Sequence, residues 1–132
     1  MLRLLLFERP DAVPQRGAFL ILLLRNALRE LLAQGVGCVA VTMGAGGALL
    51  CWEDCVLRCE SPRVPVGSTV GAGDSVVAAL AYAEAQGLSE EEAVRLSTAA
   101  GAANVMCSGT QAAEREAVEV LLPKVRFSRL WP

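Results

Sequence analysis

Residues 68–83 read STVGAGDSVVAALAYA, and this stretch decides how the rest of the chain is interpreted. Three small residues, Gly71, Ala72 and Gly73, lead into one acid, Asp74, and an apolar run of helical character follows. The pattern predicts a tight loop that opens a helix near Asp74. The backbone N–H groups of residues 71–74 would then point outward at the positive end of the helix dipole, an arrangement that binds phosphoryl groups and other anions.

Asp74 has two interpretations. A carboxylate beside an anion site repels the anion, so a functional Asp74 would face an attacking hydroxyl and take its proton during phosphoryl transfer. Acidic residues are also common in the first turn of a helix, where the dipole stabilises them. The spacing alone leaves both interpretations open.

A second glycine-rich loop follows a valine-rich stretch at residues 35–43, GVGCVAVTM, which predicts a strand buried on both faces as in a parallel sheet. Ligands of α/β proteins bind at the carboxyl ends of such strands. Thr42 could offer a hydroxyl there, and Gly44 and Gly47 could let a ligand approach the backbone. The alternative is a loop that simply joins two strands.

A third candidate, Asn104, lies in STAAGAANV, residues 97–105, a helical stretch of small residues. Small residues permit close approach of a neighbouring helix, and we expect Gly101 to serve that packing. A buried asparagine usually satisfies backbone groups. A ligand contact is the alternative role for Asn104.

The remaining helices follow from leucine spacing and capping patterns. Residues 15–34 predict a helix that Gly35 ends. The helix beginning near Asp74 should end at Gly87. Ser89 followed by Glu92 is a capping-box pattern, which begins a helix running to about Met106. A last helix is expected from a Thr110 cap to about Leu122, ended by Pro123.

The remaining extended segments are short. Residues 48–52 and 55–59 predict a hairpin joined at Glu53-Asp54, and residues 63–66 a further extended piece. Residues 1–14 fit either helix or strand, and the tail from Arg126 gives no clear pattern. The order of the elements predicts an α/β layer arrangement around a small sheet.

Composition limits the possible functions. The chain has 132 residues, 54% of them hydrophobic, and a formal net charge of −2. This balance favours neither nucleic acid nor an anionic membrane as partner. The chain contains no histidine, which excludes histidine-based catalysis and metal ligation. The apolar runs are too short to span a bilayer, so we expect a cytoplasmic protein without a targeting segment.

The five cysteines suit a reducing compartment. Cys51, Cys55 and Cys59 are spaced by four, which raises the possibility of a metal site. The spacing is not a standard zinc pattern, and on a hairpin the three thiols would not converge. We therefore assign no metal ligands.

Taken together, these stretches resemble the ribokinase-like (PfkB) carbohydrate kinases. Residues 68–83 look like the C-terminal signature of that family, in the form most similar to 1-phosphofructokinases and tagatose-6-phosphate kinases. Residues 39–50, VAVTMGAGGALL, resemble the nucleotide-binding strand and loop of the family. Residues 88–110 resemble the helix pair that follows and the loop near the adenine. The resemblance runs from about Leu28 to Val125, and residues 1–27 diverge.

The resemblance implies a partial three-layer α/β/α fold, the C-terminal nucleotide-binding half of a kinase. It implies that Asp74 is the catalytic base and that Gly71, Ala72 and Gly73 form the anion hole. Thr42, Gly44 and Gly47 would contact ATP, and Asn104 would lie beside the adenine. The reaction implied is ATP- and Mg²⁺-dependent conversion of fructose 1-phosphate to fructose 1,6-bisphosphate.

Family members are about twice as long, and their N-terminal half supplies most sugar contacts. A half-sheet would leave an unpaired strand edge and an uncovered apolar face. We therefore expect a homodimer or association with a missing N-terminal half, with little or no kinase activity in the chain alone. A non-catalytic nucleotide-binding or dimerising fragment is the alternative.

Overall fold

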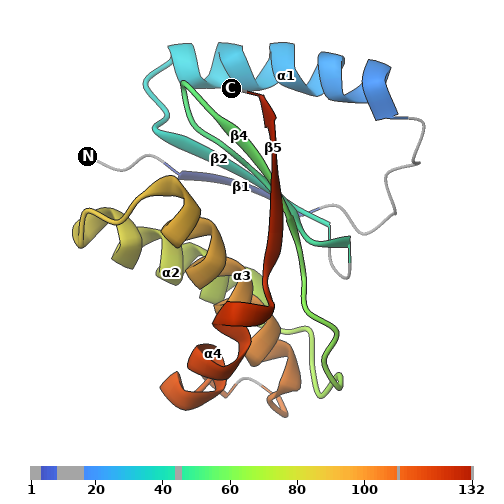
Figure 1. Ribbon diagram of the computed structural model, residues 1–132, viewed down its shortest axis with the longest axis vertical. Coiled ribbons are helices and arrows are strands. Elements are labelled where there is room, and N and C mark those ends of the chain that lie inside the picture. Colours follow the sequence, from blue (N-terminus) through green and yellow to red (C-terminus); the bar gives the residue numbers. More distant parts are fainter. Residues whose placement is uncertain (1–3, 9–16, 44–45, 110, 132) are drawn as a thin grey trace.

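Three layers make up the molecule. The structure is a computed structural model that describes residues 4–8, 17–43, 46–109 and 111–131. Helix α1 (Gly17–Ala33) lies on one face of a five-stranded sheet, and α2 (Ala72–Ala85) and α3 (Glu90–Met106) lie on the other (Figure 1). The expected layered α/β arrangement is therefore present.

The strands follow one another across the sheet in the order β1-β2-β3-β4-β5. Only the pair β1 (Leu4–Glu8) and β2 (Cys38–Thr42) is parallel among the described strands. The pairs formed with β3 (Ala48–Cys51), β4 (Val56–Glu60) and β5 (Arg126–Trp131) are antiparallel. The parallel arrangement expected around β2 is thus wrong for its pairing with β3, whereas the antiparallel β3–β4 pair is the expected hairpin. Helix α1 connects the parallel pair, whereas short turns join β2 to β3 and β3 to β4 and reverse the chain.

Each face of the sheet has its own core. On one face, strand residues pack against α2 and α3 through Leu80, Ala83, Ala93 and Val94. On the other, Val39, Val41 and Leu49 pack against Leu28 of α1. Strand β2 contributes to both clusters, which confirms that it is buried on both faces.

Helices α2 and α3 pack closely because Gly101 carries no side chain. A Cβ at Gly101 would lie 2.9 Å from Val76 Cγ2 of α2, closer than real Cβ contacts allow. The packing role expected for Gly101 is confirmed. The capping box of α3 is also present, since Ser89 Oγ accepts from Glu92 N (3.2 Å) and Glu92 Oε2 accepts from Ser89 N (2.9 Å).

Two expectations about the later chain are wrong. Residues 63–66 form no strand; Val64 instead packs beside α4 (Arg115–Leu121) in a third apolar cluster. The N-cap of α4 is Glu114, so Thr110, which lies outside the described residues, does not cap it. A short 3₁₀ turn at Leu122–Lys124 contains Pro123 and follows α4 directly.

The tail that gave no clear pattern is β5, which pairs with β4 from Glu60↔Arg126 to Val56↔Trp131. Phe127 lies opposite Cys59 and packs against the α2–α3 core, and the Arg95 guanidinium of α3 lies 4.9 Å from the centre of its ring. This segment mixes polar and apolar residues without a clear pattern. It forms a strand because it pairs with β4 and because Phe127 packs into the core.

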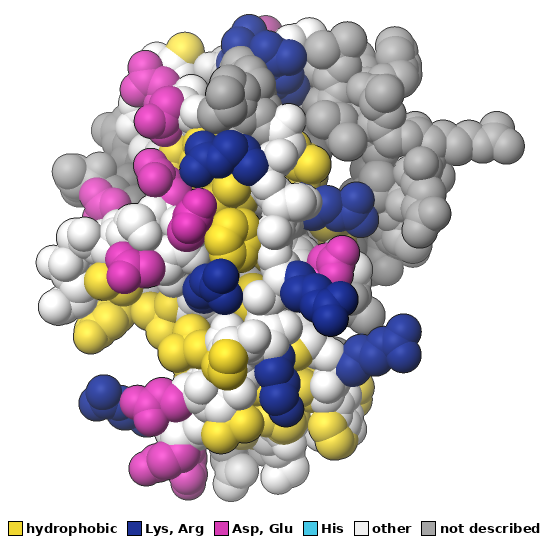
Figure 2. Space-filling view, in the orientation of Figure 1, with side chains coloured by type: hydrophobic (Ala, Val, Ile, Leu, Met, Phe, Trp, Pro, Cys, Tyr) yellow, Lys and Arg dark blue, Asp and Glu magenta, His cyan; other side chains and the backbone are white. Residues whose placement is uncertain are grey.

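Strands β1 and β5 are the outer strands of the described sheet. Each therefore has one edge that no other described strand pairs with, as expected. The expected uncovered apolar face is wrong for the central strands, because helices cover both faces. Val66, Val70 and Val120 are the large aliphatic side chains that stay most exposed among the described residues. Figure 2 shows hydrophobic side chains interspersed with basic and acidic ones over the visible face. No described helix is long and apolar enough to cross a membrane.

Candidate active site

The glycine loop begins helix α2 without a side-chain cap. Gly71 occupies the N-cap position with φ of 86°, a left-handed conformation that favours glycine. Ala72 N donates weakly to Thr69 O (3.4 Å), and Ser75 N donates to Gly71 O (3.0 Å). Within the described chain, the N–H groups of Gly73 and Asp74 have no acceptor. These donors are therefore available to an anion at the start of α2.

Asp74 lies in the first turn of α2 and is exposed. Its carboxylate takes part in no ion pair or hydrogen bond with the described residues. A carboxylate that served the helix by capping would accept a backbone hydrogen bond, and this one does not. It is accessible to a molecule bound at the loop.

Asn104 is held against the glycine loop by the packing of α3 on α2. Its side chain is 5% exposed, and its Nδ2 donates to Gln111 O at 3.1 Å. Its Oδ1 is buried without a partner in the described part of the chain. A Cβ placed on Gly71 would lie 3.4 Å from this oxygen. The fold therefore brings Asn104 and Gly71 together, although they are far apart in sequence.

A residue that the sequence analysis missed, Gly67, fixes the start of the loop. Its N–H and that of Ser68 both donate to Val105 O, at 2.8 and 3.1 Å. A Cβ at Gly67 would lie 2.5 Å from Cys107 O. Only glycine fits here, because the loop lies directly on the C-terminal end of α3. The available signal was a further glycine just before residues 68–74.

The second predicted loop lies at the end of β2. Thr42 is the last residue of that strand and is half-buried, and Gly44 lies outside the described residues. Gly47 is buried with φ of 86°, and a Cβ there would overlap the carbonyl group of Cys59 on β4. Packing against β4 thus requires glycine at this position, whether or not a ligand approaches it.

Strand pairing places the two loops at one end of the sheet. Thr42 pairs with Ala48, and Ala48 pairs with Cys59 near the end of β4. The chain leaves β4 at that end and continues to Gly67 and the glycine loop (Figure 1). The chain therefore leaves β2 and β4 at the same end of the sheet, and the segment after β4 leads from there to the start of α2.

All five cysteines are free thiols, and they do not all lie on the same face of the sheet. Cys51 packs on the α1 face of the sheet, whereas Cys55 and Cys59 pack on the α2–α3 face, which confirms that these three do not converge. Burial raises the pKa of Cys38 and Cys51 to about 12 and that of Cys59 to about 11. These three thiols therefore stay protonated at neutral pH and pack as small apolar side chains.

Comparison with known proteins covers both loops and α3. Residues 21–117 match the model of the pfkB family of carbohydrate kinases. The chain belongs to this family. The match includes Thr42, the glycine loop with Asp74, and Asn104, so the resemblance found on residues 68–83 is confirmed.

Two 1-phosphofructokinases are similar to parts of the chain. The 1-phosphofructokinase of Rhodobacter capsulatus is 51% identical over 75 residues, which is 57% of this chain and 24% of that protein. The 1-phosphofructokinase of Vibrio cholerae is 32% identical over 108 residues, 82% of this chain and 34% of that protein. The chain thus spans about a quarter to a third of the length of these relatives.

A solved phosphofructokinase structure shows the same fold. Phosphofructokinase-2 from Escherichia coli, in complex with substrates and products, superimposes with a TM-score of 0.75 at 28% identity. The superposition covers 92% of this chain and 40% of that one. The mixed α/β fold described above is therefore part of a larger kinase fold in that protein.

Proposed function

We propose that the chain serves ATP-dependent phosphorylation of a sugar-phosphate hydroxyl, of the type that converts fructose 1-phosphate to fructose 1,6-bisphosphate. The observation that carries the proposal is the uncapped start of α2, where free N–H groups and the exposed Asp74 carboxylate lie side by side in a pfkB-family chain. The similarity to 1-phosphofructokinases supports the choice of acceptor.

In this proposal Asp74 is the catalytic base. Its carboxylate accepts the proton of the sugar hydroxyl as that oxygen bonds to the γ-phosphorus and the bond to the ADP oxygen breaks. Gly71, Ala72 and Gly73 form the anion hole around the transferred phosphoryl group. The lack of an acceptor for the N–H groups of Gly73 and Asp74 fits an oxyanion at this position.

The nucleotide is assigned to the neighbouring loop and to α3. Thr42, Gly44 and Gly47 would contact ATP at the carboxyl end of β2. Asn104 would lie beside the adenine in the family-based assignment; its contact with Gly71 favours a place nearer the phosphates. Magnesium would accompany ATP and neutralise phosphate charge, and no residue of this chain is assigned to hold it.

A second candidate function is nucleotide binding or dimerisation without catalysis. The observation that favours it is the short length of the aligned region, because the chain aligns with only about a quarter to a third of each 1-phosphofructokinase. The phosphoryl-binding loop lies within that share, and no described residue is assigned to the sugar.

Calorimetry with ATP and Mg²⁺, beside a coupled kinase assay with fructose 1-phosphate, separates the two functions. Asp74→Asn should lower turnover by about 10²–10⁴-fold, the usual contribution of a general base, while ATP affinity changes little. Glu84→Gln is the matched control, since it removes an exposed carboxylate from the same helix away from the loop.

Retained turnover in Asp74→Asn would sink the catalytic assignment. Binding of ATP without turnover in the unaltered chain supports the non-catalytic function. A folded chain that binds no ATP contradicts both the kinase function and nucleotide binding, and it leaves dimerisation if the chain is also a stable oligomer.

A further inference from the structure

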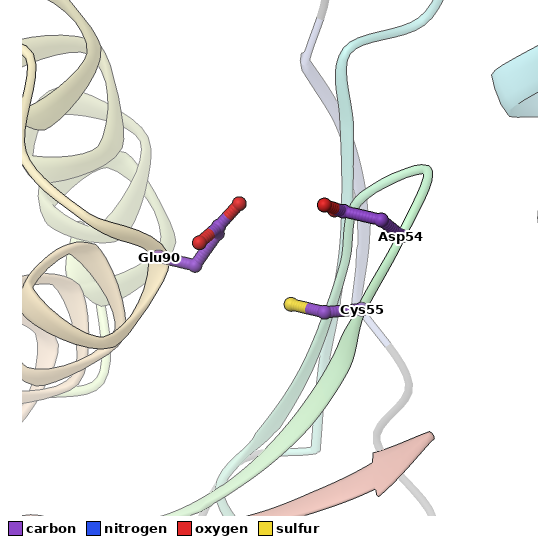
Figure 3. A group of neighbouring side chains, drawn as sticks. All are labelled: Asp54, Cys55 and Glu90. Atoms are coloured by element: carbon purple, nitrogen blue, oxygen red, sulfur yellow. The ribbon is translucent and has the colours of Figure 1, made fainter. Parts of the chain in front are cut away.

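Three ligand-forming side chains converge outside the glycine loop, where the β3–β4 turn meets the start of α3 (Figure 3). Asp54 and Cys55 come from the turn, and Glu90 is the first residue of α3. One atom of each side chain, a carboxylate oxygen or Sγ, lies within 4.8 Å of the other two. Two segments far apart in sequence thus present two carboxylates and a thiol to one point.

The thiol is the unusual member of this group. Cys55 is 1% exposed, and its Sγ has no hydrogen-bond partner in the described part of the chain. Figure 3 shows the sulfur directed toward the gap between the turn and Glu90. A small apolar residue would fill the same core position without placing a metal-binding atom beside two carboxylates.

The two carboxylates of this group are not neutralised by an ion pair within the described part of the chain. Among the described residues neither Asp54 nor Glu90 forms an ion pair. Arg129 is close enough to act on Cys55, but its guanidinium pairs with Glu91, Nη2 to Oε1, at 3.8 Å. Like charges this close repel, and a cation between them would remove the repulsion.

The helix dipole explains part of this arrangement. An acid in the first turn of a helix is stabilised by the N-terminal partial charge, which is sufficient reason for Glu90. It gives no reason for Asp54 on a separate turn to face Glu90, or for a buried thiol to point at both.

We propose that Asp54, Cys55 and Glu90 bind a zinc ion. Thiolate and carboxylate together suit Zn²⁺, whereas Mg²⁺ and Ca²⁺ take oxygen ligands. Tetrahedral zinc with Zn–S of about 2.3 Å and Zn–O of about 2.1 Å separates its sulfur and oxygen ligands by roughly 3.6 Å. With ligand atoms at most 4.8 Å apart, reaching that separation requires a shift of at most about 1.2 Å. Rotamer changes of the exposed Asp54 and the half-buried Glu90 can supply it.

The site would leave one coordination position for water or another small ligand. Glu90 also lines a cavity of about 230 Å³ together with Glu84, Ser89 and Trp52. Binding releases the thiol proton to solvent and joins the β3–β4 turn to the start of α3. The ion would thereby tie the sheet to the helix layer that carries Asn104.

Titration of the folded 132-residue chain with Zn²⁺ by calorimetry tests the site. We expect one ion per chain, and affinity at least tenfold weaker in Asp54→Asn and in Glu90→Gln. Cd²⁺ should give a thiolate charge-transfer absorption that Cys55→Ser abolishes. The matched controls Glu53→Gln and Cys107→Ser change a neighbouring carboxylate and a separate thiol, and they should leave both readouts unchanged.

Asp54 and Glu90 lie at least partly outside the core, so their variants keep the test decisive if Cys55→Ser does not fold. No saturable Zn²⁺ binding by the unaltered chain overturns the proposal. Unchanged affinity in both carboxylate variants, or a charge-transfer band that persists in folded Cys55→Ser, overturns it as well. Equal affinity for Mg²⁺ would exclude the thiolate as a ligand.

Discussion

Helices α2 and α3 lie side by side, but their N-termini are built in opposite ways. At the start of α3, Ser89 and Glu92 satisfy each other's backbone N–H groups. At the start of α2, Gly71 supplies no side chain and the N–H groups of Gly73 and Asp74 have no acceptor in the described chain. A protein that caps one helix with its own side chains and leaves its neighbour uncapped has donors available for a ligand at the second.

Among the variants that test this difference between the two helix starts, Asn104→Asp should reduce ATP affinity most. The new carboxylate would be buried beside Gly71, where it repels an anion bound at the start of α2. We expect ATP affinity, measured by calorimetry with Mg²⁺, to fall about 100-fold, which corresponds to about 2.7 kcal/mol.

Asn26→Asp is the matched control, because it makes the same chemical change on an exposed position of α1. Circular dichroism must show that both variants are folded. Unchanged ATP affinity in folded Asn104→Asp would mean that the nucleotide does not lie near the glycine loop.

Gly71→Ala should have a smaller effect and separate backbone strain from ligand binding. At φ of 86° any residue with a Cβ is strained, which costs about 1–2 kcal/mol of stability, and the added methyl approaches Asn104 Oδ1. We expect roughly tenfold weaker ATP binding by calorimetry, together with a lower midpoint of thermal unfolding.

Gly87→Ala provides the comparison for that variant. Gly87 also has a positive φ, 66°, and a Cβ there meets nothing within 4 Å. It should lose similar stability and keep the ATP affinity of the unaltered chain. Equal loss of ATP affinity in both variants would show that general destabilisation, not the loop, controls binding.

The same contrast explains what could be predicted from the sequence. The capping box of α3 depends on Ser89 and Glu92 three residues apart, and the hairpin depends on the Glu53-Asp54 turn, which Trp52 N closes by donating to Cys55 O at 2.8 Å. Both are local, so residue spacing specified them. Strand β2 was recognised because a continuous valine-rich run is typical of a strand buried on both faces.

Features that depend on distant partners were missed or misread. Strand β5 forms because Phe127 pairs opposite Cys59, and nothing within residues 126–131 encodes that partner. The apolar run that became β1 fits helix and strand equally until β2 is beside it. At the candidate site, the loop was visible in the sequence, but the contact between Gly71 and Asn104 and the anchoring of Gly67 on α3 required the packed helices.

Ser89→Ala should have the smallest effect and complete the comparison from the other helix. Removing the hydroxyl leaves Glu92 N without its acceptor, and loss of such a cap typically costs about 1 kcal/mol of unfolding free energy. Urea unfolding followed by circular dichroism measures that loss, with Ser108→Ala at an exposed loop position as control. ATP affinity should not change, because the donors exposed by this variant lie at α3 and not at the glycine loop. If Ser89→Ala weakened ATP binding as much as Gly71→Ala, the two helix starts would not differ in function. The assignment of the phosphoryl site to the uncapped N-terminus of α2 would then be wrong.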